Sequence, residues 1–261
     1  MVGEAPSVLS RLSDLKGELV GRRAAALVVL VAALSLYYAG VESLPELPTW
    51  WDVAALALLL IPATFALVYL VLPLWRAQGL FLLALALGAL AVILVSAGLD
   101  VAANFVKAAA VTAAGFWFLR YFENLGWVVL VAALVPGIDA VSVWRGPTQH
   151  IVSEQREVFT ALSIAFPIPG EHASANLGLP DVLFFALFLA ATVRFGLRTA
   201  WTWVAMTLSF GATMALAVAS DAAGLPALPG LCIAFLGVNA DLIWARVRRS
   251  REPESEGGGG S

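Results

Sequence analysis

The stretch Val135-Pro136-Gly137-Ile138-Asp139-Ala140-Val141-Ser142-Val143-Trp144 sets a single carboxylate among mostly apolar residues. It closes a longer apolar run that begins near Asn124. About 20 mostly apolar residues are enough for a helix to cross a bilayer. A carboxylate inside such a helix is costly, so one that is kept there usually has a task. The stretch therefore predicts a membrane-spanning helix that carries a functional aspartate.

The composition of the whole chain is typical of a membrane protein. Of its 261 residues, 61% are hydrophobic and 13% are charged, and the mean hydropathy is +0.90. A soluble domain has no use for so much apolar surface. The net charge of −3, without any basic tract, gives no reason to expect nucleic acid as a partner. The single cysteine, Cys232, cannot form an intrachain disulfide.

The apolar stretches predict an all-α, polytopic membrane protein with about eight transmembrane helices. The expected spans are Ala24–Ser43, Trp51–Leu74, Gly79–Leu99, Val101–Leu119, Asn124–Trp144, Leu179–Phe195, Ala200–Ala219 and Leu225–Trp244. Only Gly98-Leu99-Asp100 separates the third span from the fourth, and merging them would give a run too long for one crossing. Before the first span, Val8–Val20 shows helical periodicity. This segment is either an interfacial amphipathic helix or an extension of the first span.

Basic residues predict the orientation of the chain. They precede the first span, follow the second, fourth and sixth, and follow the eighth, so an even number of spans puts them on one side. We therefore expect both termini in the cytoplasm and the loop 145–176 outside. Lys107 and the basic residues of that loop do not follow the pattern.

The chain divides into five predicted segments. An N-terminal cytoplasmic or interfacial segment (1–23) precedes the N-terminal helices (24–144), which end with the first aspartate. The extracytoplasmic loop (145–176) leads to the C-terminal helices (177–249), which carry the second aspartate. The tail (250–261) ends in Gly-Gly-Gly-Gly-Ser, which is typical of an artificial linker.

A second aspartate follows the loop, in Leu177-Gly178-Leu179-Pro180-Asp181-Val182-Leu183. At a rise of 1.5 Å per residue, Asp139 and Asp181 lie within about 10 Å of the same end of consecutive antiparallel helices. Two carboxylates at one depth can share a proton and activate a water molecule. The alternative is that each aspartate only pairs with a basic residue or faces the lipid headgroups.

A third feature lies at the start of the last span, in Gly224-Leu225-Pro226-Ala227-Leu228-Pro229-Gly230. Two prolines oppose regular helix there, and unwound backbone at membrane depth is tolerated only where protein or a water-filled cavity covers it. An ordinary helix start, where proline is common, is the alternative.

These three motifs, in this order, resemble the presenilin and signal-peptide-peptidase family of intramembrane aspartyl proteases, and most closely its prokaryotic presenilin homologues. The run from Asp139 to Val143 is similar to the first aspartate motif of the family, Gly178-Leu179-Pro180-Asp181 to its Gly-x-Gly-Asp motif, and Pro226-Ala227-Leu228 to its Pro-Ala-Leu motif. The resemblance covers roughly Val135 to Trp244. It implies a presenilin-like bundle, with one helix fewer than the usual nine, in a prokaryotic plasma membrane.

The resemblance also implies the activity. Asp139 and Asp181 would be the catalytic pair, and Gly178, Leu179, Pro180, Pro226, Ala227 and Leu228 would bind the substrate. Substrates would be single transmembrane segments or signal peptides within the lipid bilayer, and no metal, organic cofactor or obligatory partner is implied. The segment Ile164–Pro169 of the loop could offer an exposed strand edge to such a substrate; a loop without that role is the alternative.

Two positions depart from the family pattern. Ile138 stands where the family has a tyrosine, and Pro180 stands where it has a glycine. The loss of that glycine bears on substrate preference and on activity, because glycine permits close approach of a substrate backbone.

The sequence also bears on other classes of function. Both histidines, His150 and His172, lie in the loop, and the chain has no His-Glu-x-x-His motif, so serine and zinc intramembrane proteases are disfavoured. A proton- or ion-coupled transporter or channel would also keep buried carboxylates. A catalytically silent member of the family is a third interpretation.

Overall fold

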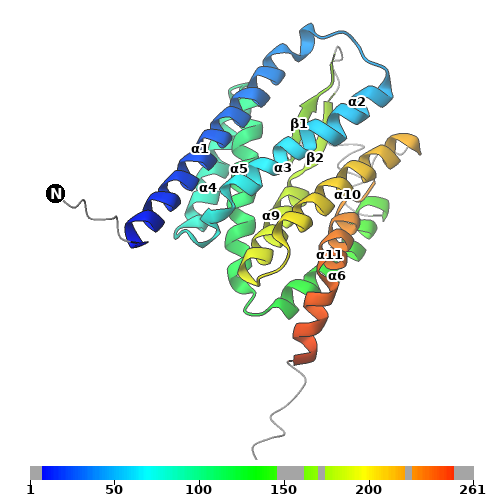
Figure 1. Cartoon of the computed structure of the whole chain (residues 1–261). Helices are drawn as coiled ribbons and strands as arrows, with labels where there is room; N and C mark the ends of the chain where they lie inside the picture. Colours follow the sequence, from blue (N-terminus) through cyan, green and yellow to red (C-terminus); the bar gives the residue numbers. More distant parts are fainter. Residues whose placement is uncertain (1–7, 146–161, 170–173, 221–224, 250–261) are drawn as a thin grey trace, which may run out of the picture.

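The fold is an assembly of long apolar helices with one small hairpin (Figure 1). The computed structural model describes residues 8–145, 162–169, 174–220 and 225–249. Its elements in chain order are α1 (Val8–Gly40), η1 (Val41–Ser43), α2 (Thr49–Ala55), η2 (Leu56–Leu60), α3 (Ile61–Val71), η3 (Leu72–Arg76), α4 (Leu80–Ser96), α5 (Asp100–Phe118), η4 (Leu119–Tyr121), α6 (Leu125–Arg145), β1 (Ser163–Pro167), β2 (Ser174–Gly178), α9 (Leu179–Arg194), α10 (Thr199–Ala219) and α11 (Leu228–Arg249). The prediction of an all-α polytopic membrane protein is confirmed.

A helix occupies each of the predicted spans, although the number eight itself stays a prediction. Within the described residues, five helical stretches are long and apolar enough to cross a membrane, and α4 and the Leu125–Asp139 part of α6 are shorter apolar stretches. The chain breaks at Gly98, whose φ of 71° ends α4 in the left-handed region, so the predicted split before Asp100 is confirmed. At the N-terminus, α1 is one continuous helix of 33 residues. Val8–Val20 is therefore an extension of the first span.

The second span passes through a π-helical stretch, η2, between α2 and α3. Pro62 follows it in the first turn of α3 and has no N–H to donate to the preceding turn, which accounts for the wider hydrogen-bond spacing there. The backbone of Ala57 in this stretch lies against Gly211 of α10, where an added Cβ would come within 3.2 Å of the Ala57 carbonyl oxygen. Helix α10 thus packs closely against the second span at this stretch.

Helix α9 forms the centre of the bundle. Its residues Phe185 to Ala191 are all completely buried, in keeping with a sequence that is apolar on every face. Phe185 stacks on Phe65 of α3 at a centroid distance of 3.8 Å, and Phe188 stacks on Phe235 of α11 at 4.7 Å. The second aspartate is therefore on the least mobile kind of support, a helix packed on all sides.

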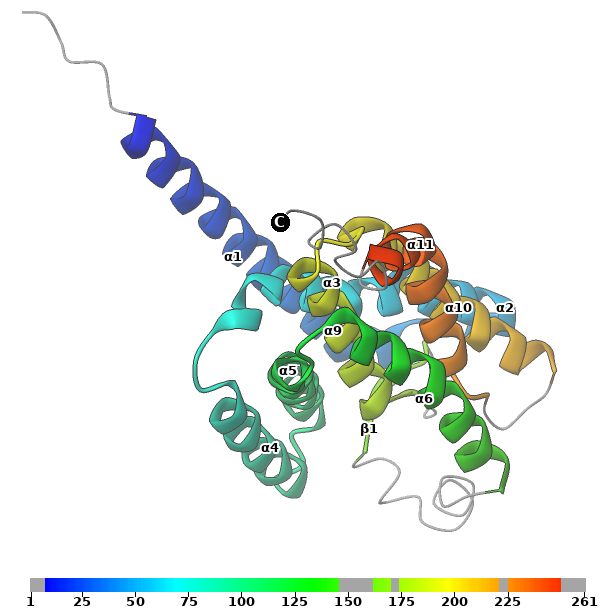
Figure 2. The same ribbon diagram turned by 90° about the horizontal axis from the view of Figure 1, so that it is seen from below.

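Two helices lie on one flank of this centre. Gly115 of α5 touches α9 so closely that an added Cβ would lie 2.6 Å from the carbonyl oxygen of Leu183. On its other side α5 packs along α4, and together they stand apart from α6, α10 and α11 (Figure 2).

One end of the bundle gathers the arginines that follow the helices. Arg194 donates to the carbonyl of Leu119 at 2.6 Å, and Arg120 donates to that of Ala77. Arg198 forms a two-pronged ion pair with Asp241, with both N–O distances 2.7 Å. Arg198 reaches Asp241 because the α9–α10 loop folds back over α11, where the backbone N–H of Arg198 also donates to Asn239.

The loop between the two aspartates contains the β-hairpin, and its first strand is not an exposed edge as expected. Ile164 and Phe166 are each 3% exposed, and Leu177 of the second strand is 2% exposed. The strands are antiparallel, with Ser163 opposite Gly178 and Pro167 opposite Ser174. Strand β1 is covered because its apolar side chains are large enough to join the core of the bundle.

Candidate active site

The first predicted aspartate contacts the predicted Pro-Ala-Leu segment. Asp139 lies six residues before the end of α6, and its Oδ2 accepts a hydrogen bond of 3.2 Å from the backbone N–H of Leu228. Leu228 is the first residue of α11, whose initial N–H groups have no partner within the helix. Residues 89 positions apart in the sequence are thereby joined.

The second predicted aspartate is held by the glycine that precedes its helix. Gly178 is the residue before α9, and its backbone N–H donates a hydrogen bond to the Asp181 carboxylate. A Cβ on Gly178 would lie 2.8 Å from Oδ2 of Asp181. A side chain at this position would therefore displace the carboxylate from its present place.

The two carboxylates lie close enough to interact electrostatically. The sulfur of Cys232, one turn into α11, also lies within the electrostatic range of Asp139. Three helices, α6, α9 and α11, thus converge at one point. The prediction that both aspartates lie at the same ends of adjacent helices matches this geometry.

Both aspartates also have a structural use. Asp139 caps the start of α11 from another helix, and Asp181 reaches back from the third position of α9 to the residue before it, as in one half of a capping box. A negative charge near a helix N-terminus is stabilising in its own right. Helix capping alone would explain each aspartate singly, but it would not require two caps to lie side by side.

Pro180 and Leu179 occupy the first turn of α9. Pro180 is exposed and stands where proline suits the helical φ, as its position in the sequence suggested. The N–H of Leu179 donates to the carbonyl of Leu162 at 3.1 Å, which extends the pairing of the hairpin by one step. Both side chains are apolar, so neither can form a hydrogen bond with Asp139.

Pro226 and Ala227 form the non-helical segment before α11, as the two prolines predicted. Pro226 lines an open cavity of about 480 Å³ with Pro136 and Gly137 of α6 and with Thr213 of α10. The walls are mostly apolar, and Gly137 stands two residues from Asp139. The site therefore has apolar space on the side of the Pro-Ala-Leu segment.

The outer edge of β1 is bound by four polar side chains that the sequence gave no reason to group. Tyr38 and Asn104 donate to the carbonyl of Ala165 at 2.7 and 3.2 Å, and Asn104 accepts from its N–H at 3.3 Å. Tyr37 donates to Pro167 at 2.8 Å, and Lys107 donates to Ser163 at 3.1 Å. We call Tyr37, Tyr38, Asn104 and Lys107 the edge clamp. Its members come from α1 and α5 and take the place of a third strand.

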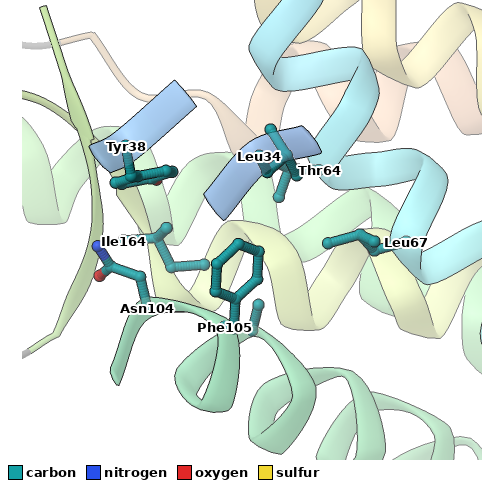
Figure 3. A pocket seen from close by; sticks show the side chains of 8 residues that line it. Leu34, Tyr38, Thr64, Leu67, Asn104, Phe105 and Ile164 are labelled. Atoms are coloured by element: carbon teal, nitrogen blue, oxygen red, sulfur yellow. The ribbon is translucent and has the colours of Figure 1, made fainter. Parts of the chain in front are cut away.

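The clamp closes over a small cavity between α1, α3, α5 and β1. Figure 3 shows Tyr38 and Asn104 beside the strand, with Phe105 and Ile164 between the helices. The cavity holds about 10 Å³, which is the lower limit for one water molecule. In the sequence, the only sign of the edge clamp was that Asn104 and Lys107 interrupt an apolar span. A polar residue within a span is by default a candidate for function.

The remaining edge of the hairpin belongs to β2. In an antiparallel pair the backbone groups of successive residues point alternately toward the partner strand and away from it. The N–H and C=O of Ala165 point toward the clamp. The N–H and C=O of Asn176, which lies opposite Ala165, therefore point away from β1. Asn176 is exposed.

Comparison with known proteins gives no family for this chain. No model of a known protein family matches it, and no curated protein sequence matches it.

Proposed function

We propose that the chain is an intramembrane aspartyl protease that hydrolyses transmembrane segments or signal peptides. The observation that carries the proposal is the convergence of α6, α9 and α11, which places Asp139 on the N–H of Leu228 and within Coulombic range of Asp181. The three short motifs that resemble the presenilin and signal-peptide-peptidase family thus form one cluster in space. Helix capping explains each aspartate alone, whereas a shared reaction explains why they are neighbours.

The chemistry needs one proton between the two carboxylates. Two carboxylates that share a site do not both ionise readily, so the proposed mechanism has one charged and one protonated. The charged carboxylate takes a proton from water as the water oxygen attacks the peptide carbonyl, and the protonated one gives its proton to the carbonyl oxygen. Collapse of the resulting diol then breaks the C–N bond: the first carboxyl group gives its proton to the leaving nitrogen, and the second carboxylate takes a proton from a hydroxyl group of the diol, which restores the starting state of the pair.

Substrate alignment would use the outer edge of β2. An extended segment pairing with Asn176 would run directly toward Gly178 and Asp181, because β2 ends at Gly178. The edge clamp excludes the same pairing at β1. The apolar cavity beside Pro226 would accept side chains of the bound segment.

The test is cleavage of a synthetic transmembrane peptide by the purified chain in liposomes, followed by mass spectrometry. Asp139→Asn and Asp181→Asn should each lower the rate by about a thousandfold or more, as loss of a catalytic group does. Asparagine caps helices as well as aspartate does, so both variants should keep the melting temperature of the parent; alanine would instead cost about 1 kcal/mol per cap. Asp100→Asn, at the exposed start of α5, is the matched control and should cleave normally.

The result also separates the rival functions. Cleavage that persists in both asparagine variants would contradict a catalytic role for Asp139 and Asp181. Proton or ion flux that the same variants abolish, with no cleavage by the parent, would favour a transporter. A silent family member would cleave nothing, and Pro180→Gly, which restores the glycine of the family pattern, would then test for a gain of activity.

A further inference from the structure

Lys107 is a buried cation that the proposed chemistry does not use. It lies in α5, between Asn104 and the Gly115 contact with α9, and is only 7% exposed. Its Nζ donates a hydrogen bond of 3.1 Å to the carbonyl of Ser163. A lysine inside a span is costly, so its position calls for a function.

The hydrogen bond ends at the base of the hairpin, next to the catalytic pair. Ser163 is the first residue of β1, is 1% exposed, and stands opposite Gly178 in the strand register. Gly178 in turn donates its N–H to Asp181 and lies so close to that carboxylate that it has no room for a Cβ. A short path therefore leads from Lys107 through Ser163 and Gly178 to Asp181.

The other members of the edge clamp act further away. Tyr38 and Asn104 bind Ala165, in the middle of β1, and Tyr37 binds Pro167 at its far end. Lys107 is the clamp residue that holds the position opposite Gly178. Loss of Asn104 should loosen the middle of the strand, whereas loss of Lys107 should loosen the end that touches the site.

We propose that Lys107 is a positioning residue for Asp181, acting through Ser163 and Gly178. The inference rests on the proposed protease function, since it assigns Lys107 a role at that site. It also makes a separate statement about the hairpin, namely that the ammonium group fixes the pairing of Ser163 with Gly178. A misplacement of about 1 Å at a reacting group can cost a hundredfold in rate.

The experiment compares Lys107→Met with Lys107→Arg in the full chain, reconstituted in lipid nanodiscs. Methionine keeps the length and apolar stem but removes the donor, and arginine restores a cationic donor. Thr112→Val is the matched control, a buried polar residue of the same helix. Two measurements are made: kcat and KM on a transmembrane peptide with its cleavage position, and amide hydrogen exchange of residues 174–181.

The expected result is a kcat about tenfold to a hundredfold lower in Lys107→Met, with KM changed less than threefold and cleavage spread over neighbouring bonds. Exchange at Leu177 and Leu179 should rise about tenfold. Lys107→Arg should recover most of both, and Thr112→Val should resemble the parent. Loss of protein yield in Lys107→Met would move the comparison to Lys107→Gln, which keeps a neutral donor.

Unchanged exchange and unchanged kcat in Lys107→Met would overturn the proposal. A rise in KM alone would also overturn it, because that would assign Lys107 to substrate binding. If the parent cleaves no peptide, the protease function fails, and hydrogen exchange still decides whether Lys107 fixes the hairpin.

Discussion

At the scale of single residues, the two aspartates combine a capping role with a placement that suits catalysis. Each accepts one backbone N–H at the start of a helix, Asp139 from Leu228 and Asp181 from Gly178. Such a bond fixes the rotamer of the carboxylate without using all its lone pairs. The remaining lone pairs are available to a proton and a water molecule. Capping and catalysis are therefore compatible at these positions.

Gly178 gives a sharp test of this placement. Gly178→Ala puts a Cβ 2.8 Å from the present position of the Asp181 Oδ2, which is too close for the carboxylate to stay where it is. Gly178 has φ −61° and ψ 138°, which alanine adopts without strain, so the effect should come from the displaced carboxylate. We expect cleavage to fall about tenfold or more, with little change in melting temperature.

The matched control is Gly237→Ala in α11, where an added Cβ meets nothing within 4 Å. This change should leave cleavage intact and stabilise the helix by about 0.5–1 kcal/mol. Equal cleavage rates for the parent and both glycine variants would contradict the placement of Asp181 described above.

The two aspartates could be found from the sequence because a carboxylate in an apolar stretch stands out locally, whatever it contacts in the fold. The edge clamp could not be found in this way. Tyr37 and Tyr38 read as ordinary aromatic residues near a span end, and the strand that they bind lies 127 or more residues away in the sequence. Only the folded chain shows that their hydroxyl groups satisfy the carbonyls of a buried strand.

At the scale of elements, the contact of α5 with α9 sets the position of the second aspartate. Gly115 and the backbone of Leu183 touch one turn or less from Asp181. Small residues at helix contacts in membranes let the backbones approach, and van der Waals packing then holds the pair together. The depth of Asp181 thus depends on a residue of α5 that touches neither aspartate.

Gly115→Ala tests this dependence. The new Cβ would lie 2.6 Å from the Leu183 carbonyl and 3.1 Å from the Cβ of Ala186, so α5 and α9 must separate. We expect a loss of stability of about 1–3 kcal/mol, measured by denaturant unfolding in detergent, and a parallel loss of cleavage. Gly88→Ala in α4, where an added Cβ meets nothing within 4 Å, should leave cleavage unchanged and raise stability by about 0.5–1 kcal/mol. A stable and fully active Gly115→Ala variant would show that the helix contact is more tolerant than its geometry indicates.

The helices followed from apolar length, and their ends followed from glycine and proline. The break at Gly98 and the unwound stretch at Pro226 and Ala227 are both local effects of backbone chemistry. The hairpin was not predicted as two paired strands, because its stability comes from burial of Ile164 and Phe166 and from the edge clamp. Both causes are tertiary.

At the scale of the whole molecule, the arginine-rich end determines which parts of the chain share a side. Arg120, Arg194 and Arg198 all bind backbone or carboxylate groups at one end of the bundle, whereas the hairpin and both aspartates lie toward the other. This segregation agrees with the even number of spans inferred from the basic residues. The side of the membrane that each end faces stays a prediction.

Cysteine labelling in intact cells would decide the topology. Cys232 is completely buried, so a membrane-impermeant maleimide should not label the parent. We expect cysteine at Ser13 or Pro253 to react only after the cells are opened, and cysteine at Gln155 to react in intact cells. Reaction of Ser13→Cys and Pro253→Cys from opposite sides would require an odd number of spans.

The hydrogen bond between Asp139 and Leu228 has a consequence for biosynthesis. Both aspartates leave the ribosome before α11, yet the amide that orients Asp139 belongs to the first residue of α11. A nascent chain that lacks α11 therefore carries both carboxylates in the membrane without the contact that aligns them. If the proposed function holds, insertion of α11 is the step that would complete the site, and chains that still lack α11 would be inactive.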